Sequence, residues 1–164
     1  MSDPDRALED PPGRRPYVWT TLAAGVLSVL LALLWLAIAP TPAVRVAGEV
    51  VVSDAVPEFA AAQDSLFALL AIGAGLVHGV VALAVGRARL AVMLVAVAAG
   101  AAGSLVAWRL GVLLGPAPLA VQRVSGGALV APLALQALGV LGLWPAVAAL
   151  TVFVGLLPGG LRGR

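Results

Sequence analysis

The sequence predicts an all-α integral membrane protein with four transmembrane helices. Three observations support this fold class: 62% of the 164 residues are hydrophobic, only 11% are charged, and the apolar residues fall into four long runs. Soluble domains usually carry about a quarter charged residues, and a chain of this length has too little interior to hide so much apolar surface from water. The expected solvent and first partner of the protein is therefore the lipid bilayer.

The first expected membrane helix covers residues 18–39, "VWTTLAAGVLSVLLALLWLAIA". This run is long enough, because about 20 residues cross the hydrocarbon core. Tyr17 and Trp19 suit one membrane interface, and prolines at positions 40 and 42 end the helix at the other. A cleaved signal peptide is the rival interpretation, since "AIA" at 37–39 resembles a cleavage site. The length of the apolar run and the proline after it favour a retained helix.

Three further membrane helices are expected at about residues 65–86, 90–110 and 133–157. In the loop before the second, "VRVAGEVVV" (44–52) alternates like a short hairpin. Pro57 and Glu58 suit a helix start, from which a helix could run continuously into the membrane. Residues 40–64 and 115–133 are expected to form a small extracytoplasmic cap. The remaining segments are a disordered cytoplasmic tail at 1–17, a transmembrane domain at 18–158 and a cytoplasmic tail at 159–164.

The distribution of arginine predicts that both termini lie in the cytoplasm. Cytoplasmic loops of membrane proteins carry an excess of basic residues. The two tails and the "GRAR" turn at 86–89 hold seven arginines, whereas the two opposite loops and the adjoining helix end hold three. The seven are at positions 6, 14, 15, 87, 89, 162 and 164, and the three are at positions 45, 109 and 123.

His78 is the only histidine of the chain and the only ionisable residue within 69–86. Helical rise places it about 12 Å from the inner end of its helix. Ionisable groups inside membranes are often functional, so His78 could be a proton or substrate site. The interpretation we favour is a neutral imidazole bound to one hydroxyl or carbonyl, with Ser28 and Thr151 at similar depth. No metal is expected there, because no Cys, Asp or Glu lies near enough to complete a ligand set.

Two helices carry stripes of small residues, which let helix backbones approach closely in lipid. In the second span the stripe contains Gly75 and Gly79, and in the third it contains Gly100 and Gly103. We expect the second and third spans to form a close antiparallel hairpin through these stripes, because the turn between them is short.

Four other residues are candidates for polar contacts or for shaping a helix. Arg109 is expected to reach the headgroups beside Trp108, or to pair with an acid at the outer rim such as Asp64. Gln136 could form a hydrogen bond across helices near the outer end of the fourth span. Pro145 cannot donate to the carbonyl of Leu141, so a kink is expected near the middle of that span.

Several function classes are disfavoured by the sequence. It has no cysteine, no catalytic triad, no H-E-x-x-H motif and no phosphate-binding glycine loop, so we expect neither an enzyme nor a cofactor. The pI near 10.4 rests on a net charge of only +2, without a basic patch that would bind nucleic acid.

Three segments are similar to an actinobacterial family of small four-span membrane proteins of unknown function. They are "LLWLAIAP" at 33–40, "DSLFALLAIGAGL" at 64–76 and "APLALQALGVLGLWPAV" at 131–147. The resemblance covers most of residues 20–157 and implies a multi-pass protein of a bacterial plasma membrane. It carries no catalytic or ligand-binding residues with it.

Two functional hypotheses follow from the sequence. The first is a non-enzymatic accessory or scaffolding protein that binds other membrane proteins or itself. The alternative is a small transporter or channel-like subunit that uses His78 and a hinge at Pro145. A transporter usually needs several polar groups near the membrane midplane, and the sequence offers one histidine and a few hydroxyls.

Overall fold

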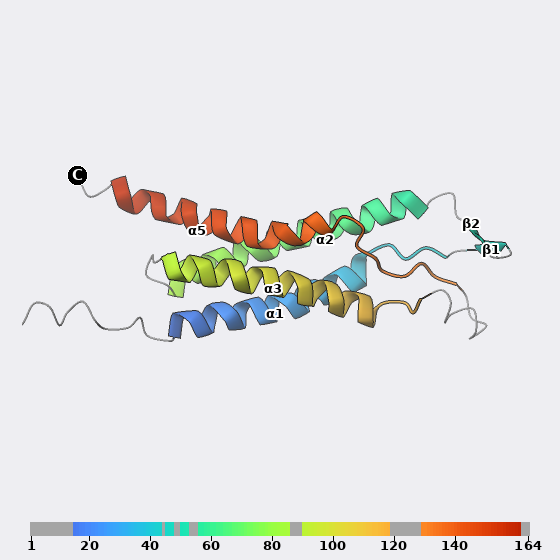
Figure 1. The fold of residues 1–164 in the computed structure, drawn as a ribbon, viewed down its shortest axis with the longest axis horizontal. Helices are drawn as coiled ribbons and strands as arrows, with labels where there is room; N and C mark the ends of the chain where they lie inside the picture. The colour runs from blue at the N-terminus through green and yellow to red at the C-terminus, as the bar shows by residue number, and fades with distance from the viewer. Residues whose placement is uncertain are drawn as a thin grey trace, which may run out of the picture.

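The protein is a bundle of four long helices with a small cap at one end, as the computed structural model shows (Figure 1). The structure describes residues 15–43, 45–47, 50–52, 56–85, 90–118 and 129–161. Four helical segments are long and apolar enough to cross a membrane, which confirms the expected four-span architecture. In chain order the elements are α1 (Arg15–Ile38), β1 (Arg45–Ala47), β2 (Val50–Val52), α2 (Val56–Val85), α3 (Leu90–Leu114), the 3₁₀ helix η2 (Leu138–Gly142) and α5 (Leu143–Leu161).

The cap lies at the end of the bundle opposite the start of α1 and the end of α5, and we call these the cap end and the terminal end (Figure 1). The expected hairpin is present: β1 and β2 pair antiparallel, with Val46 opposite Val51. The helix expected to start near Pro57 is also present, since α2 begins at Val56 and is 30 residues long. At 1.5 Å per residue it measures about 45 Å, so its first turns project beyond a hydrocarbon core of about 30 Å.

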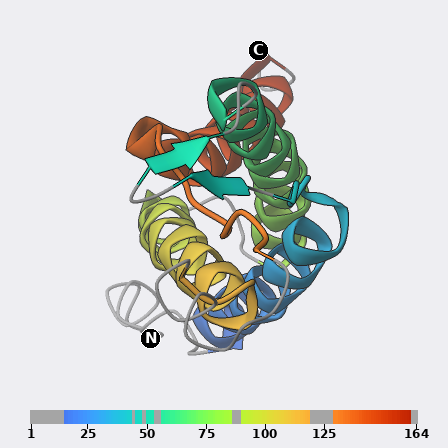
Figure 2. The same ribbon diagram turned by 90° about the vertical axis from the view of Figure 1, so that its right-hand side faces the viewer.

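The expected pairing of the second and third spans is wrong. Viewed along the bundle, α2 and α3 lie diagonally opposite, and α1 and α5 each pack against both of them (Figure 2). A short connection fixes only the neighbouring ends of two helices. Along the rest of their length, the glycines of α2 pack against α5. The glycines of α3 pack against side chains of α1 and α5.

The fourth membrane helix starts later than expected. Residues 131–137 have no regular structure, the 3₁₀ helix η2 follows, and α5 begins only at Leu143. The backbone N–H groups of Ala134, Gln136 and Ala137 all donate to side chains of α2. These contacts hold the segment against α2 and replace the helical turns that the apolar composition of 133–137 predicted.

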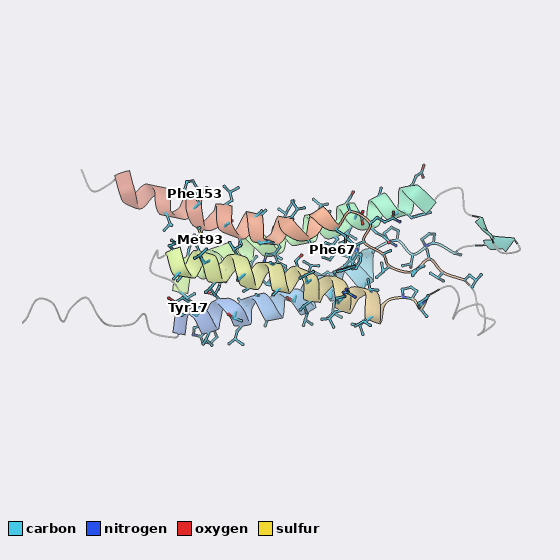
Figure 3. All side chains as sticks on the ribbon, viewed as in Figure 1. Tyr17, Phe67, Met93 and Phe153 are labelled. Carbon is cyan, nitrogen blue, oxygen red and sulfur yellow. The ribbon has the colours of Figure 1, made fainter. Side chains whose placement is uncertain are left out.

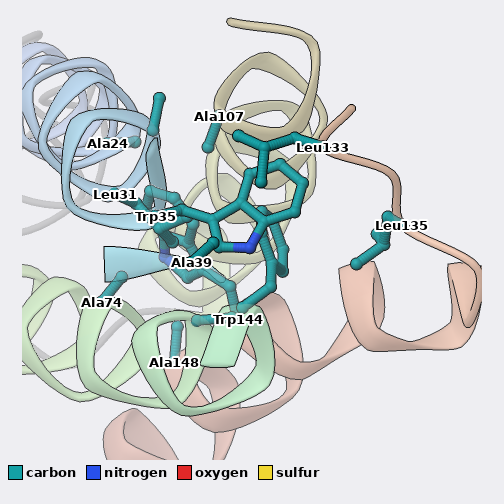
Figure 4. Close-up of a cluster of buried hydrophobic side chains, with 13 residues drawn as sticks. Ala24, Leu31, Trp35, Ala39, Ala74, Ala107, Leu133, Leu135, Trp144 and Ala148 are labelled. Carbon is teal, nitrogen blue, oxygen red and sulfur yellow. The ribbon is translucent and has the colours of Figure 1, made fainter. Parts of the chain in front are cut away.

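Two clusters of buried side chains form the core. The larger is built around Trp35, Phe67 and Trp144, with small residues from the surrounding helices (Figure 4). The rings of Trp35 and Phe67 meet edge to face, with centroids 5.1 Å apart. The smaller cluster includes Val92 and Val152, with Tyr17 and Met93 packed against it at the terminal end of the bundle (Figure 3). Large aromatic rings thus fill the half of the bundle nearer the cap.

Candidate functional site

His78 is completely buried where three helices meet. Its Nε2 lies 3.1 Å from the backbone oxygen of Thr20 on α1, and its Nδ1 lies 3.2 Å from the indole Nε1 of Trp144 on α5. His78 and Trp144 both have 0% of their surface exposed. The single mid-membrane imidazole therefore joins α2 to α1 and to α5.

The two partners of His78 determine its tautomer. An indole nitrogen can only donate a hydrogen bond, so Nδ1 of His78 must accept one. A backbone carbonyl can only accept, so Nε2 must carry the proton and donate it to Thr20. This arrangement describes a neutral imidazole with both nitrogens engaged. A carbonyl rather than a hydroxyl satisfies the donor, in agreement with one of the two partners expected from the sequence.

Trp144 extends the His78 site to the fourth helix. Its ring stands nearly perpendicular to that of His78, with centroids 6.0 Å apart. Two glycines of α3 make room for the indole: a Cβ atom added at Gly100 would lie 3.3 Å from Cδ1, beside the N–H that binds His78, and one added at Gly103 would lie 3.0 Å from Cη2 of the six-membered ring. All four membrane helices therefore contribute to one buried centre.

The hydroxyl groups expected near His78 do not bind it. Ser28 donates to the carbonyl of Ala24 at 2.6 Å, and Thr151 donates to the carbonyl of Val147 at 2.8 Å. Each hydroxyl thus donates to the backbone carbonyl four residues earlier in its own helix, as serine and threonine commonly do inside helices. Among the described side chains, the buried Ser104 hydroxyl and the buried Trp108 indole nitrogen have no hydrogen-bond partner.

Gln63 forms a second polar site at the cap end of the bundle. Only 3% of its surface is exposed. Its Nε2 donates to the carbonyl of Pro40 at 2.8 Å, and its Oε1 accepts from the N–H of Ala134 at 3.1 Å. The indole of Trp35 donates to its backbone oxygen at 3.1 Å. One amide side chain therefore ties the end of α1 and the segment before η2 to α2.

Asp64 lies beside Gln63 and holds the same segment. Its two carboxylate oxygens accept the N–H groups of Gln136 at 3.0 Å and Ala137 at 2.8 Å, directly before η2. Both residues precede η2 and lie outside regular structure, so no helix or sheet supplies a partner for their N–H groups, and the carboxylate of Asp64 does. Together Gln63 and Asp64 form what we call the cap latch, which fixes where the fourth helix begins.

The candidate residues Arg109, Gln136 and Pro145 contribute no side chain to either of these two polar sites. Arg109 is exposed, and its guanidinium lies 4.6 Å from the centre of the Trp108 ring, within cation–π distance. Gln136 has an exposed side chain, and its backbone rather than its amide makes the contact with α2. Pro145 lies in the first turn of α5, where an N–H has no partner within the helix, and not in the middle of a continuous helix as expected. The chain changes from 3₁₀ to α-helical winding at Leu143, two residues before it.

Gly75 and Gly79 lie at a close helix–helix contact as expected, but the helix they contact is α5 and not α3. A Cβ atom added at Gly75 would lie 2.7 Å from the carbonyl oxygen of Trp144. One added at Gly79 would lie 2.6 Å from the Cβ of Thr151. Both glycines therefore bring α2 against α5, the helix that carries the partner of His78.

Sequence reasoning missed Gln63, the carbonyl of Thr20 and the indole of Trp144. Gln63 precedes Asp64 in the sequence, and a second polar residue at the mouth of an apolar span was the available signal. Within the part of the chain that the structure describes, no three His, Asp or Glu side chains gather to hold a metal ion. Comparison with known proteins gives no match: no family model, no curated protein and no solved structure is detectably similar to the chain.

Proposed function

We propose that this chain is a non-enzymatic accessory or scaffolding protein of a bacterial plasma membrane, with both termini in the cytoplasm. The observation that carries the proposal is the state of His78: it is fully buried and both ring nitrogens bind groups of the protein itself. A proton- or substrate-carrying imidazole needs a nitrogen that can exchange partners. Here the imidazole instead joins three helices.

The lipid-facing surface agrees with a role in contacts between proteins. Large apolar side chains are exposed along α2, α3 and α5, among them Leu69, Leu113 and Phe153. Such side chains contact lipid in an isolated bundle and are available to the helices of a partner or of a second copy. The plasma membrane location is part of the proposal and rests on the resemblance of residues 33–40, 64–76 and 131–147 to an actinobacterial four-span family, which no family model reproduces.

Flux measurements test the proposal against transport. The protein is reconstituted into liposomes that contain a pH-sensitive dye, and a proton gradient is applied to wild type and His78→Leu. We expect both to leak no faster than protein-free liposomes. A proton flux in wild type that His78→Leu abolishes would contradict the scaffold proposal.

Photo-cross-linking in native membranes tests the scaffold role directly. A photoreactive amino acid is placed at Leu113 and at Phe153, which are both exposed, and samples kept in the dark serve as the control. We expect a defined, light-dependent protein adduct from at least one of the two positions. Lipid adducts alone at both exposed positions would count against a protein partner.

A further inference from the structure

A groove between α1 and α2 faces the surroundings of the bundle along much of its length. It consists of two hollows: about 390 Å³ towards the terminal end, where Trp19 lies at its edge, and about 240 Å³ towards the cap end, where Gly73 lies in its wall. Leu27 and Val77 line both hollows, so the two adjoin. Every residue that lines them is hydrophobic or glycine.

The hollows correspond in depth to the two leaflets of a bilayer. The membrane-spanning part of α1 is Tyr17–Ile38, and Leu27 lies at its middle. From Leu27, the helix rises about 12 Å back to Trp19 and about 10 Å on to Leu34. One leaflet contributes about 15 Å of hydrocarbon. Each hollow therefore covers most of one leaflet, and the two meet near the midplane.

The size and chemistry of the hollows select their occupant. A docked helix would place one row of side chains into the groove and would run past the midplane as a continuous rod. The groove is instead divided into hollows of about 390 and 240 Å³ that each cover one leaflet, which is the reach of one acyl chain. Water is disfavoured because it needs two to four polar partners. An alkyl chain makes only apolar contacts, with its carbons about 4 Å from their neighbours, and so fits the apolar lining.

We propose that the α1–α2 groove is a lipid-binding site that holds one acyl chain in each hollow. The attraction comes from close contact rather than from removal of water, because the chain leaves one hydrocarbon environment for another. Shape therefore decides binding, and a side chain that fills a hollow should release the lipid chain in it.

Gly73 offers a substitution that fills the cap-end hollow without disturbing the bundle. A Cβ atom added there meets nothing within 4 Å. Gly25 of α1 provides the matched control, because a Cβ atom there also meets nothing within 4 Å and the residue lines neither hollow. Gly73→Leu and Gly25→Leu thus add the same side chain, inside and outside the groove. Ala23→Leu addresses the terminal-end hollow in the same way.

Native mass spectrometry of protein released from nanodiscs of one synthetic phosphatidylcholine measures the bound lipids. We expect wild type and Gly25→Leu to retain up to two lipid molecules, and the two-lipid population to fall at least five-fold in Gly73→Leu. Ala23→Leu should cause a similar loss, and thermal unfolding in detergent confirms that each variant is folded. Equal retention in wild type, Gly73→Leu and Gly25→Leu would overturn the proposal. A wild-type dimer that Gly73→Leu abolishes would overturn it in favour of a second copy.

Discussion

The two sides of α2 differ in how much space they leave beside a glycine. On the side that faces α5, a Cβ atom at Gly75 would lie 2.7 Å from a backbone oxygen, whereas two residues away at Gly73 it would meet nothing within 4 Å. Both glycines belong to the same "GAG" segment, and both are surrounded by apolar residues in sequence. In lipid, apolarity does not distinguish a buried face from an exposed one, so the contacts of each residue must decide.

The largest expected effect comes from filling the packed side of α2. Gly79→Leu would drive a side chain into Thr151 and the backbone of Ala148, so we expect it to lower the free energy of unfolding by about 3 kcal/mol, the upper end of the usual range for overpacking. Gly73→Leu, on the open side, should change it by less than about 0.5 kcal/mol. Unfolding in detergent measures both, and equal stability of the two variants would refute the α2–α5 packing.

His78 and its neighbour Val77 also differ in burial, and substitutions at the two positions should differ in their effect on stability. His78→Leu leaves the indole N–H of Trp144 buried without an acceptor, which should cost about 1–3 kcal/mol. Val77 is 52% exposed, so Val77→Leu should be nearly neutral.

A double-mutant cycle isolates the hydrogen bond to His78. Trp144→Phe removes the N–H, so the loss in His78→Leu plus Trp144→Phe should be smaller than the sum of the two single losses. Additive losses would show that the hydrogen bond contributes nothing measurable.

Asp64 and Ser65 are neighbours at the cap end, and a variant at Ser65 serves as the control for one at Asp64. Asp64→Ala removes the acceptor of two backbone N–H groups, so we expect the amides of Gln136 and Ala137 to exchange with solvent roughly five-fold faster, a change of about 1 kcal/mol. Ser65 donates only to the carbonyl of Ala61 in its own helix, and Ser65→Ala should leave both exchange rates unchanged. Hydrogen–deuterium exchange measures them, and unchanged rates in Asp64→Ala would rule out the cap latch.

The smallest expected effect concerns Arg109. The guanidinium lies over Trp108, and the Asp64 carboxylate is occupied by backbone N–H groups. Reversing both charges, as Arg109→Asp with Asp64→Arg, should therefore show a coupling energy below about 0.3 kcal/mol, at the lower end for exposed ion pairs. A clearly larger coupling would indicate the ion pair that the sequence allowed as an alternative.

The sequence predicted most of the architecture because length and hydropathy are local properties. The four spans, the hairpin and the start of α2 near Pro57 all follow from the identities of nearby residues. The partners of the glycine stripes could not be predicted in this way, since a stripe shows which face of a helix packs closely and not which helix covers it. The short turn at 86–89 suggested the wrong partner.

The candidate site was predicted in part for a similar reason. His78 stood out because it is ionisable within an apolar span, and Asp64 because it is an acid at the outer rim, where an ion pair with Arg109 was the contact considered. Their partners are largely backbone groups, at Thr20, Gln136 and Ala137, and backbone groups are the same at every position of a sequence. The sequence drew attention to Pro145, whereas the indole nitrogen of the preceding Trp144 makes the contact. The late start of the fourth helix depends on these contacts and was not visible in hydropathy.

The cap latch also bears on the order in which the chain assembles during synthesis. The register of the last membrane crossing depends on two side chains about seventy residues upstream, so it cannot be set until α2 is already in place. A nascent chain that has inserted only three helices would still lack the backbone N–H groups that bind the Oε1 of Gln63 and the carboxylate of Asp64. The final helix would then be positioned by acceptor groups that α2 already presents at the cap end of the bundle, and these groups would favour one depth of insertion.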